Sequence, residues 1–200
     1  MRPLLLFALG LAVWAGCFVL ISQLGTWAPL AALGPLLALW ALRSDANARL
    51  LVRPEGRLLA IGLVGGLVMT AATYALFALA TRLEPSVGAL TQALYVTLRA
   101  PSFSPLARGL LIPLVAAAEE VVFRGTVLSG GTRPALRAVA VSSILLGVAH
   151  LASGSWLLAL VAALSGAAWG GLRVATRSCV PSIVTHVLWD LAILVVRPLA

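Results

Sequence analysis

Both histidines of this 200-residue chain, and three of its six acidic residues, lie in segments that are apolar enough to enter a lipid bilayer. Together with a neighbouring arginine they are, in chain order, Glu119, Glu120, Arg124, His150, His186 and Asp190. An ionisable side chain at membrane depth costs roughly 2.5 to 3.5 kcal/mol on insertion scales, so such groups normally face inward and have a function. The pattern therefore indicates an active site embedded in the membrane.

Two adjacent glutamates precede an arginine in the segment AEEVVFR, residues 118–124. In a regular α-helix Glu120 and Arg124, four positions apart, share a face and can pair. Glu119 is five positions from Arg124, about 140° around such a helix, so it is predicted to point elsewhere. A buried carboxylate without a cation partner is suited to general-base catalysis near neutral pH. The alternative is a structural ion pair with one spare glutamate.

The two histidines lie on later apolar segments. His150 ends the run LLGVAH and, taken alone, suits a packing role as well as a functional one. His186 and Asp190 are four positions apart, so the carboxylate can orient the imidazole, although a plain hydrogen bond between helices has the same spacing. At 1.5 Å per residue, all these groups can meet in the middle third of a core about 30 Å thick.

The composition is that of an integral membrane protein. Hydrophobic residues make up 62% of the chain and charged residues 10%, and the mean hydropathy is +1.08. These values exclude a disordered chain and argue against an ordinary soluble domain. All of the basic charge is arginine, mostly at the borders of apolar runs, so membrane topology and anionic headgroups explain the net charge of +8 better than nucleic acid does.

The apolar runs predict an all-α, polytopic transmembrane helix bundle that forms one integral membrane domain over residues 1–200. The first run is longer than a signal-peptide core, so we expect it to be retained as a helix. Charged residues and prolines bracket residues 87–98, which favours an interfacial or re-entrant helix there over an eighth crossing. The seven predicted spans are residues 4–22, 27–42 (with a kink at Gly34-Pro35), 58–80, 106–128, 137–151, 156–172 and 182–196.

The arginines predict the orientation of the bundle. Nine of them fall on one side of the predicted spans: Arg2, Arg43, Arg49, Arg53, Arg57, Arg133, Arg137, Arg173 and Arg177. Four fall on the other side: Arg82, Arg99, Arg108 and Arg197. Because arginine is enriched in cytoplasmic loops, we expect the N-terminus in the cytoplasm.

Three motifs now stand in order: Glu-Glu-x-x-x-Arg at 119–124, the histidine that closes the fifth span, and His-x-x-x-Asp at 186–190. This set resembles the CPBP family of intramembrane endopeptidases, also called the Abi or CAAX-protease family. The stretch from Gly166-x-x-x-Gly170 to Ser182 is similar to the family's usual lead into its third motif. The resemblance covers residues 106–196, the predicted catalytic helices, and the first three spans carry none of these motifs.

The resemblance implies a division of work in the site. Glu119 with His150 would activate a water for attack on a peptide carbonyl, and His186 with Asp190 would stabilise the oxyanion. Glu120 and Arg124 would support them. Two positions depart from the family pattern: Leu146 replaces a phenylalanine, and Asp190 stands where many members have asparagine, which is a better oxyanion donor than an ionised aspartate.

No cofactor is expected, and zinc is the main alternative. Glu119, His150 and His186 match the three protein ligands of a catalytic zinc site, although the chain has no His-Glu-x-x-His. Two non-enzymatic classes also remain open: a transporter with midplane carboxylates, and a catalytically silent immunity or scaffold protein.

The expected partners follow from the family and the composition. We expect a membrane-anchored protein or peptide substrate, for example a C-terminal sorting segment or a precursor, together with the lipid bilayer and no nucleic acid. A chain rich in alanine, leucine, glycine and arginine suggests a GC-rich bacterium, and hence the bacterial inner membrane.

Overall fold

The computed structural model describes residues 3–98, 104–125 and 135–199, and within these ranges every regular element is helical. The α-helices are α1 (Pro3–Leu24), α2 (Ala28–Ser44), α3 (Ala46–Leu51), α4 (Gly56–Leu83), α5 (Ser86–Leu98), α6 (Pro105–Glu120), α7 (Ala135–His150), α8 (Trp156–Thr176) and α9 (Val180–Leu191). Short segments extend three of them: the π-helical η1 (Val121–Gly125) after α6, the 3₁₀ turn η2 (Leu151–Ser153) after α7, and the π-helical η3 (Ala192–Val196) after α9. The predicted all-α bundle is confirmed.

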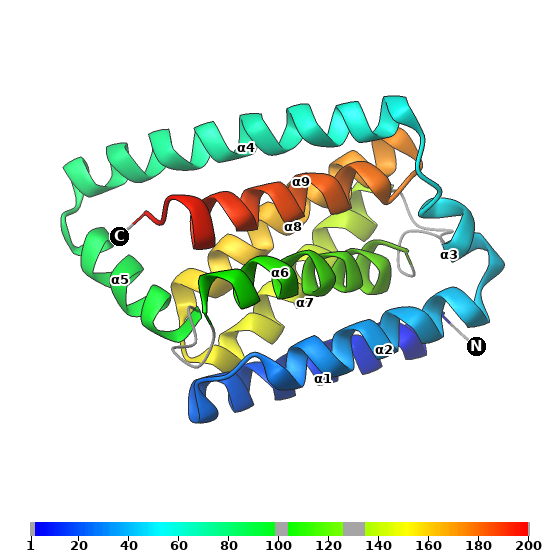
Figure 1. Ribbon diagram of the computed structural model, residues 1–200, viewed down its shortest axis with the longest axis horizontal. Helices are drawn as coiled ribbons and strands as arrows, with labels where there is room; N and C mark the ends of the chain where they lie inside the picture. The colour runs from blue at the N-terminus through cyan, green and yellow to red at the C-terminus, as the bar shows by residue number, and fades with distance from the viewer. Residues whose placement is uncertain (1–2, 99–103, 126–134, 200) are drawn as a thin grey trace.

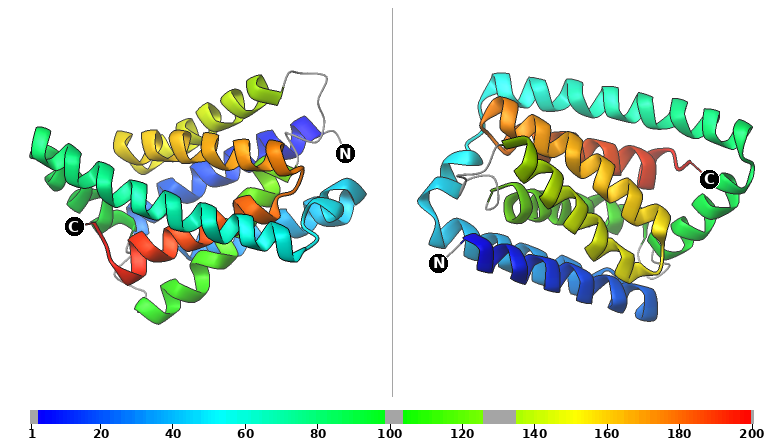
Figure 2. Two further views of the ribbon diagram at one scale, coloured as in Figure 1. Left: turned by 90° about the horizontal axis from the view of Figure 1, so that it is seen from above. Right: turned by 180° about the vertical axis from the view of Figure 1, so that it is seen from behind.

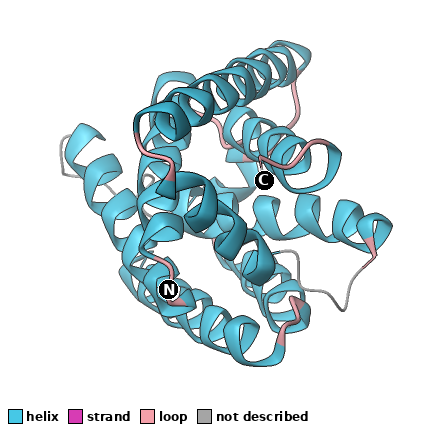
Figure 3. Ribbon diagram, turned by 90° about the vertical axis from the view of Figure 1, so that its left-hand side faces the viewer, coloured by secondary structure: helices cyan, strands magenta, loops and turns pink. Residues whose placement is uncertain are grey.

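The long helices lie roughly side by side in three groups (Figure 1). α1 and α2 form an antiparallel pair along one edge of the molecule, and α4 runs along the opposite edge. Helices α6 to α9 fill the space between these edges, and the view from behind shows the same order (Figure 2). Seen from the end at the left of Figure 1, the bundle consists of helices joined by loops (Figure 3). The central group is therefore the part of the fold that can enclose a buried site.

The edge helix α4 packs against α9 through glycines. A Cβ atom added at Gly62 would lie 2.6 Å from the Cβ of Val184, and one added at Gly66 would lie 2.9 Å from the side chain of Leu188. The Thr185 hydroxyl donates a hydrogen bond of 3.0 Å to the Gly62 carbonyl. Small residues thus let the two backbones approach closely, as is common between helices in membranes.

Helices long and apolar enough to cross a membrane are Leu5–Leu24, Gly56–Leu83, Ala135–Ser153 and Trp156–Thr176. Residues 28–44 and 180–196 form shorter apolar helices. The chain is therefore polytopic, and the count of seven spans remains a prediction. At 1.5 Å per residue, the 13 residues of α5 extend about 20 Å, which is too short for a full crossing of a core about 30 Å thick.

The predicted helix boundaries agree with the structure to within a few residues, with one correction. Residues 46–51 lie between two of the predicted spans, yet they form the helix α3, whose start is capped by the Asp45 carboxylate as it accepts a hydrogen bond of 2.8 Å from the Asn47 amide. Three predictions fall partly outside the described residues: the end of the fourth span at 126–128, the stretch 99–103, and the positions of Arg2, Arg99 and Arg133.

Candidate active site

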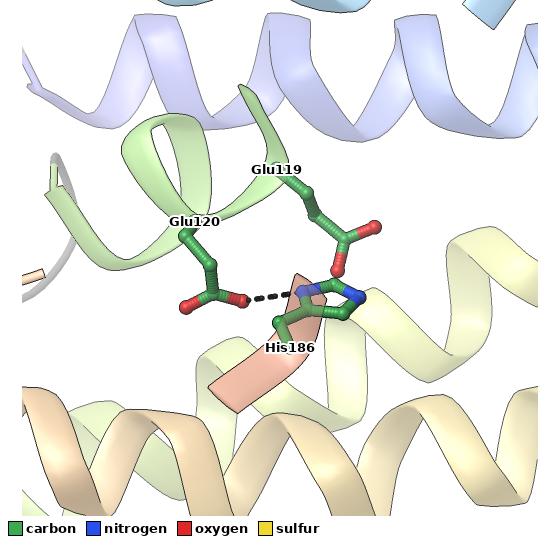
Figure 4. Close-up of side chains that lie close together, drawn as sticks. All are labelled: Glu119, Glu120 and His186. Atoms are coloured by element: carbon green, nitrogen blue, oxygen red, sulfur yellow. Dashed lines mark hydrogen bonds and ion pairs between the residues drawn. The ribbon is translucent and has the colours of Figure 1, made fainter. Parts of the chain in front are cut away.

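The last two residues of α6 place two carboxylates at the centre of the bundle (Figure 4). Glu119 is 6% exposed and Glu120 is fully buried. The helix then changes to the π-helical segment η1, which carries Arg124, 1% exposed. A buried charge is tolerated only where other groups compensate it, so the partners of these three side chains define the site.

Arg124 lies against both glutamates. Its Nη1 atom is 3.4 Å from Oε1 of Glu120 and 3.6 Å from Oε1 of Glu119. The predicted pairing of Glu120 with Arg124 is confirmed, but the expectation that Glu119 points away from Arg124 is wrong. The reason is the π-helical turn, whose hydrogen bonds join residues five apart and bring them onto one face.

Helix α1 fixes Glu119 from the other side. The indole Nε1 of Trp14 donates a hydrogen bond of 2.8 Å to Oε2 of Glu119, and Trp14 is fully buried. Phe18, one turn further along α1, packs against the His150 ring with centroids 4.4 Å apart. One face of α1 therefore positions both residues that the family resemblance assigns to water activation.

His150, the last residue of α7, has a defined tautomer. Its Nδ1 atom is 2.9 Å from the carbonyl oxygen of Leu146. A carbonyl only accepts hydrogen bonds, so Nδ1 carries the proton and Nε2 of the neutral ring presents a lone pair. Nε2 faces Glu119, at 4.0 Å from Oε2. The Leu146 side chain takes no part in this hydrogen bond, so replacement of the family's phenylalanine leaves it intact.

His186 of α9 lies between two other carboxylates. Its Nδ1 atom is 3.1 Å from Oε1 of Glu120, and its Nε2 atom is 3.3 Å from Oδ2 of Asp190. The Trp169 ring of α8 stacks on the imidazole at 3.6 Å between centroids, and the Arg124 guanidinium lies 5.5 Å from the same indole. Each nitrogen of His186 faces an acceptor, which favours the doubly protonated ring.

Gly166 of α8 gives Arg124 its space. A Cβ atom at this position would lie 2.8 Å from Nη2 of Arg124 and 3.5 Å from Ser143 and Leu146 of α7. At Gly170 a Cβ atom would meet Val139 of α7 at 2.9 Å. Gly170 therefore allows α8 to pack closely against α7. Gly166 does the same and also leaves room for the Arg124 side chain in the site.

The structure tests which residues could share a metal ion. Among the described residues, the side chains with ligand atoms within 4.8 Å of one another are those of Glu119, Glu120 and His186, so Glu120 takes the place expected for His150. Arg124 lies beside the Oε1 atoms of both glutamates. This cation and a zinc ion would repel each other at the same carboxylates, so the residues fit zinc poorly.

Sequence reasoning missed three residues of the site: Trp14, Phe18 and Trp169. They belong to no family motif, and in an apolar helix an aromatic residue of an active site cannot be told from one that packs in the hydrophobic core. One signal was available for Trp14, since a buried indole N–H needs a partner inside a membrane, but the sequence cannot identify Glu119 as that partner.

Replacing Trp14 by phenylalanine is expected to reduce turnover about tenfold while leaving KM nearly unchanged. Phenylalanine keeps a ring in the core but removes the donor to Glu119, so the base loses its fixed orientation. Trp40→Phe on α2 is the matched control, since Trp40 is exposed. Equal kcat for the Trp14→Phe variant and the wild type would show that the hydrogen bond does not position Glu119.

Comparison with known proteins adds one match. Residues 101–192 match the family model described as type II CAAX prenyl endopeptidase Rce1-like. This segment contains all six candidate site residues. No curated protein and no solved structure matches the chain. The resemblance to the CPBP family drawn from the three motifs is confirmed.

Proposed function

We propose that this chain, a membrane protease of the CAAX type, is an intramembrane endopeptidase in which Glu119 and His150 activate the attacking water. The observation that carries the proposal is the pair of acceptor atoms facing each other, Glu119 Oε2 and His150 Nε2, 4.0 Å apart. A water about 2.8 Å from both atoms can donate one hydrogen bond to each. Trp14 and Phe18 of α1 support this geometry by holding the two side chains in place.

The reaction then follows from these positions. Glu119 takes a proton from the water while the water oxygen bonds to the carbonyl carbon of the scissile peptide. The carbonyl oxygen becomes an oxyanion, and a protonated His186 can donate to it once the peptide displaces one of its carboxylate contacts. The proton held by Glu119 passes to the leaving nitrogen as the carbon–nitrogen bond breaks. His150 helps by holding the second water hydrogen, and Asp190 and Glu120 hold the charge on His186.

The substrate that suits this site is a membrane-anchored protein or peptide. Glu119, His150 and His186 are all buried in the bundle, so the scissile bond must enter the membrane domain to reach them. We favour a bacterial substrate, either a C-terminal sorting segment or a peptide precursor, since the arginine-rich and lysine-free composition points to a bacterial cytoplasmic membrane.

We further propose that the reaction needs no metal, because Arg124 already lies beside the carboxylates that a zinc ion would use. Purified protein in proteoliposomes should cleave membrane-anchored reporter peptides after exhaustive treatment with a membrane-permeant chelator. Elemental analysis of the active sample should find no stoichiometric zinc. The metal-free mechanism is wrong if one zinc per chain leaves together with activity and zinc alone restores it.

The orientation is also a proposal. The ends of α2 and α8 and the starts of α1 and α4 lie at one end of the bundle (Figure 1), and this end carries Arg43, Arg53, Arg57 and Arg177. The excess of arginine supports a cytoplasmic location for it. A single cysteine at Arg53, in a chain without Cys17 and Cys179, should react with an impermeant thiol reagent only after the membrane is opened. Labelling in intact cells would reverse the orientation.

A further inference from the structure

A pocket of about 470 Å³ opens at the arginine-rich end of the bundle, away from the catalytic residues. One side is lined by Arg53 and Glu55, which lie between α3 and α4, and by Arg57 in the first turn of α4. The end of α8 and the turn into α9 line the other side, with Arg177 among them. Three guanidinium groups and one carboxylate give the lining a net charge of +2 from these residues.

The arginines of this pocket are available for a ligand. Arg53, Arg57 and Arg177 are exposed, and within the described part of the chain none of them forms an ion pair with a carboxylate. Arginine presents several N–H donors in a fixed plane, which suits the oxygens of a phosphate group. The charge therefore points to an anion with several oxygens.

The backbone at Arg177 supports a role for its side chain. Arg177 ends α8 with a φ of 55° and a ψ of 25°, and no other described non-glycine residue has a positive φ. This left-handed position at a helix end is normally taken by glycine, which adopts it without steric cost. Strained backbone of this kind gathers at ligand-binding sites, where the side chain is needed.

The two walls of the pocket are tied together. The Cys179 amide donates a hydrogen bond of 2.8 Å to the Leu51 carbonyl, and the Ser178 hydroxyl donates one of 3.0 Å to the same oxygen. The pocket is thus built in advance, and a ligand that bridges its walls would hold the start of α4 to the start of α9.

We propose that this pocket binds a phosphate group, supplied by the headgroup of an anionic phospholipid. The location supports a lipid as the source, because α4, which begins at the pocket, exposes apolar side chains such as Leu59, Leu63 and Leu67 along its length. A headgroup in the pocket would leave its acyl chains beside this surface. Basic pockets between membrane helices are known to hold such headgroups. The proposal does not depend on the proteolytic activity.

Thermal unfolding of the purified full-length chain in a neutral detergent tests the proposal. Phosphatidylglycerol should raise Tm by about 2 to 4 °C, while phosphatidylcholine with the same acyl chains should not. Arg53→Gln and Arg57→Gln should each lose at least half of this shift. Arg43→Gln, which removes an exposed arginine from the same end but outside the pocket, should keep it.

Arg177→Gly separates binding from folding. Glycine relieves the left-handed backbone, so without lipid this variant should unfold at or above the wild-type Tm, yet it should respond less to phosphatidylglycerol. Potassium phosphate, compared with potassium chloride of equal ionic strength, distinguishes a lipid headgroup from free phosphate. If potassium phosphate raised Tm as much as phosphatidylglycerol does, the pocket would be assigned to free phosphate. No shift with either compound, or an equal shift in all variants, would overturn the proposal.

Discussion

Replacing Glu119 by glutamine is expected to reduce peptide cleavage by at least about 100-fold, because the glutamine amide cannot take the proton from the attacking water. The replacement keeps the shape of the side chain, and its carbonyl oxygen can still accept the hydrogen bond from Trp14. The protein should therefore insert and fold. The measurement is single-turnover cleavage of a reporter peptide in proteoliposomes, combined with thermal unfolding of the same preparation.

The matched control for this variant is Glu84→Gln. Glu84 is exposed between α4 and α5 and accepts a hydrogen bond from the Ser86 amide through one oxygen, which glutamine can replace. Its activity should equal that of the wild type. Cleavage by Glu119→Gln at the wild-type rate would exclude Glu119 as the base and would leave Glu120, the only other carboxylate of α6, as the candidate.

The sequence predicts much of this fold because lipid imposes simple rules on it. A span must be apolar over its length, so runs such as residues 58–80 identify α4 to within a few residues. Titratable groups inside such runs are rare and costly, and this made His150 and His186 visible without any structure. These rules identify which residues form a helix, but they do not predict local departures from regular α-helical geometry.

The π-helical turn shows where prediction ends. Regular α-helical spacing placed Arg124 beside Glu120 alone, whereas η1 also brings it to Glu119. A change from α- to π-helix depends on how α6 packs against α2 and α9 and how η1 packs against α1 and α2, and the local sequence does not encode these contacts. The contact of Trp14 with Glu119 is similar, because it joins residues 105 positions apart. Both features decide the electrostatics of the base, so the roles of the site residues depend on tertiary structure.

The shared arginine also explains how two adjacent carboxylates can be buried together. Two unpaired carboxylates at this spacing would repel each other in a medium of low dielectric constant. Arg124 lies within 3.6 Å of both, and His186 supplies a second cation on Glu120 when it is protonated. Glu120 thus has two cationic partners, Arg124 and protonated His186, whereas of these two cations Glu119 is paired only with Arg124. This difference supports Glu119 as the base and Glu120 as a positioning residue.

Replacing Arg124 by glutamine should accordingly cause the largest loss of stability, about 3 to 5 kcal/mol in the free energy of unfolding, because it leaves two buried carboxylates without their common cation. Denaturant titration in mixed micelles measures this loss, with Arg82→Gln at the exposed end of α4 as the control.

The double variant Glu120→Gln/Arg124→Gln should be more stable than Arg124→Gln alone, since one uncompensated charge is removed with its partner. A double variant whose loss equals the sum of the single losses would show that the two residues do not interact energetically. Both Arg124→Gln and the double variant should have low activity, because in each of them Glu119 lacks the arginine that η1 places beside it.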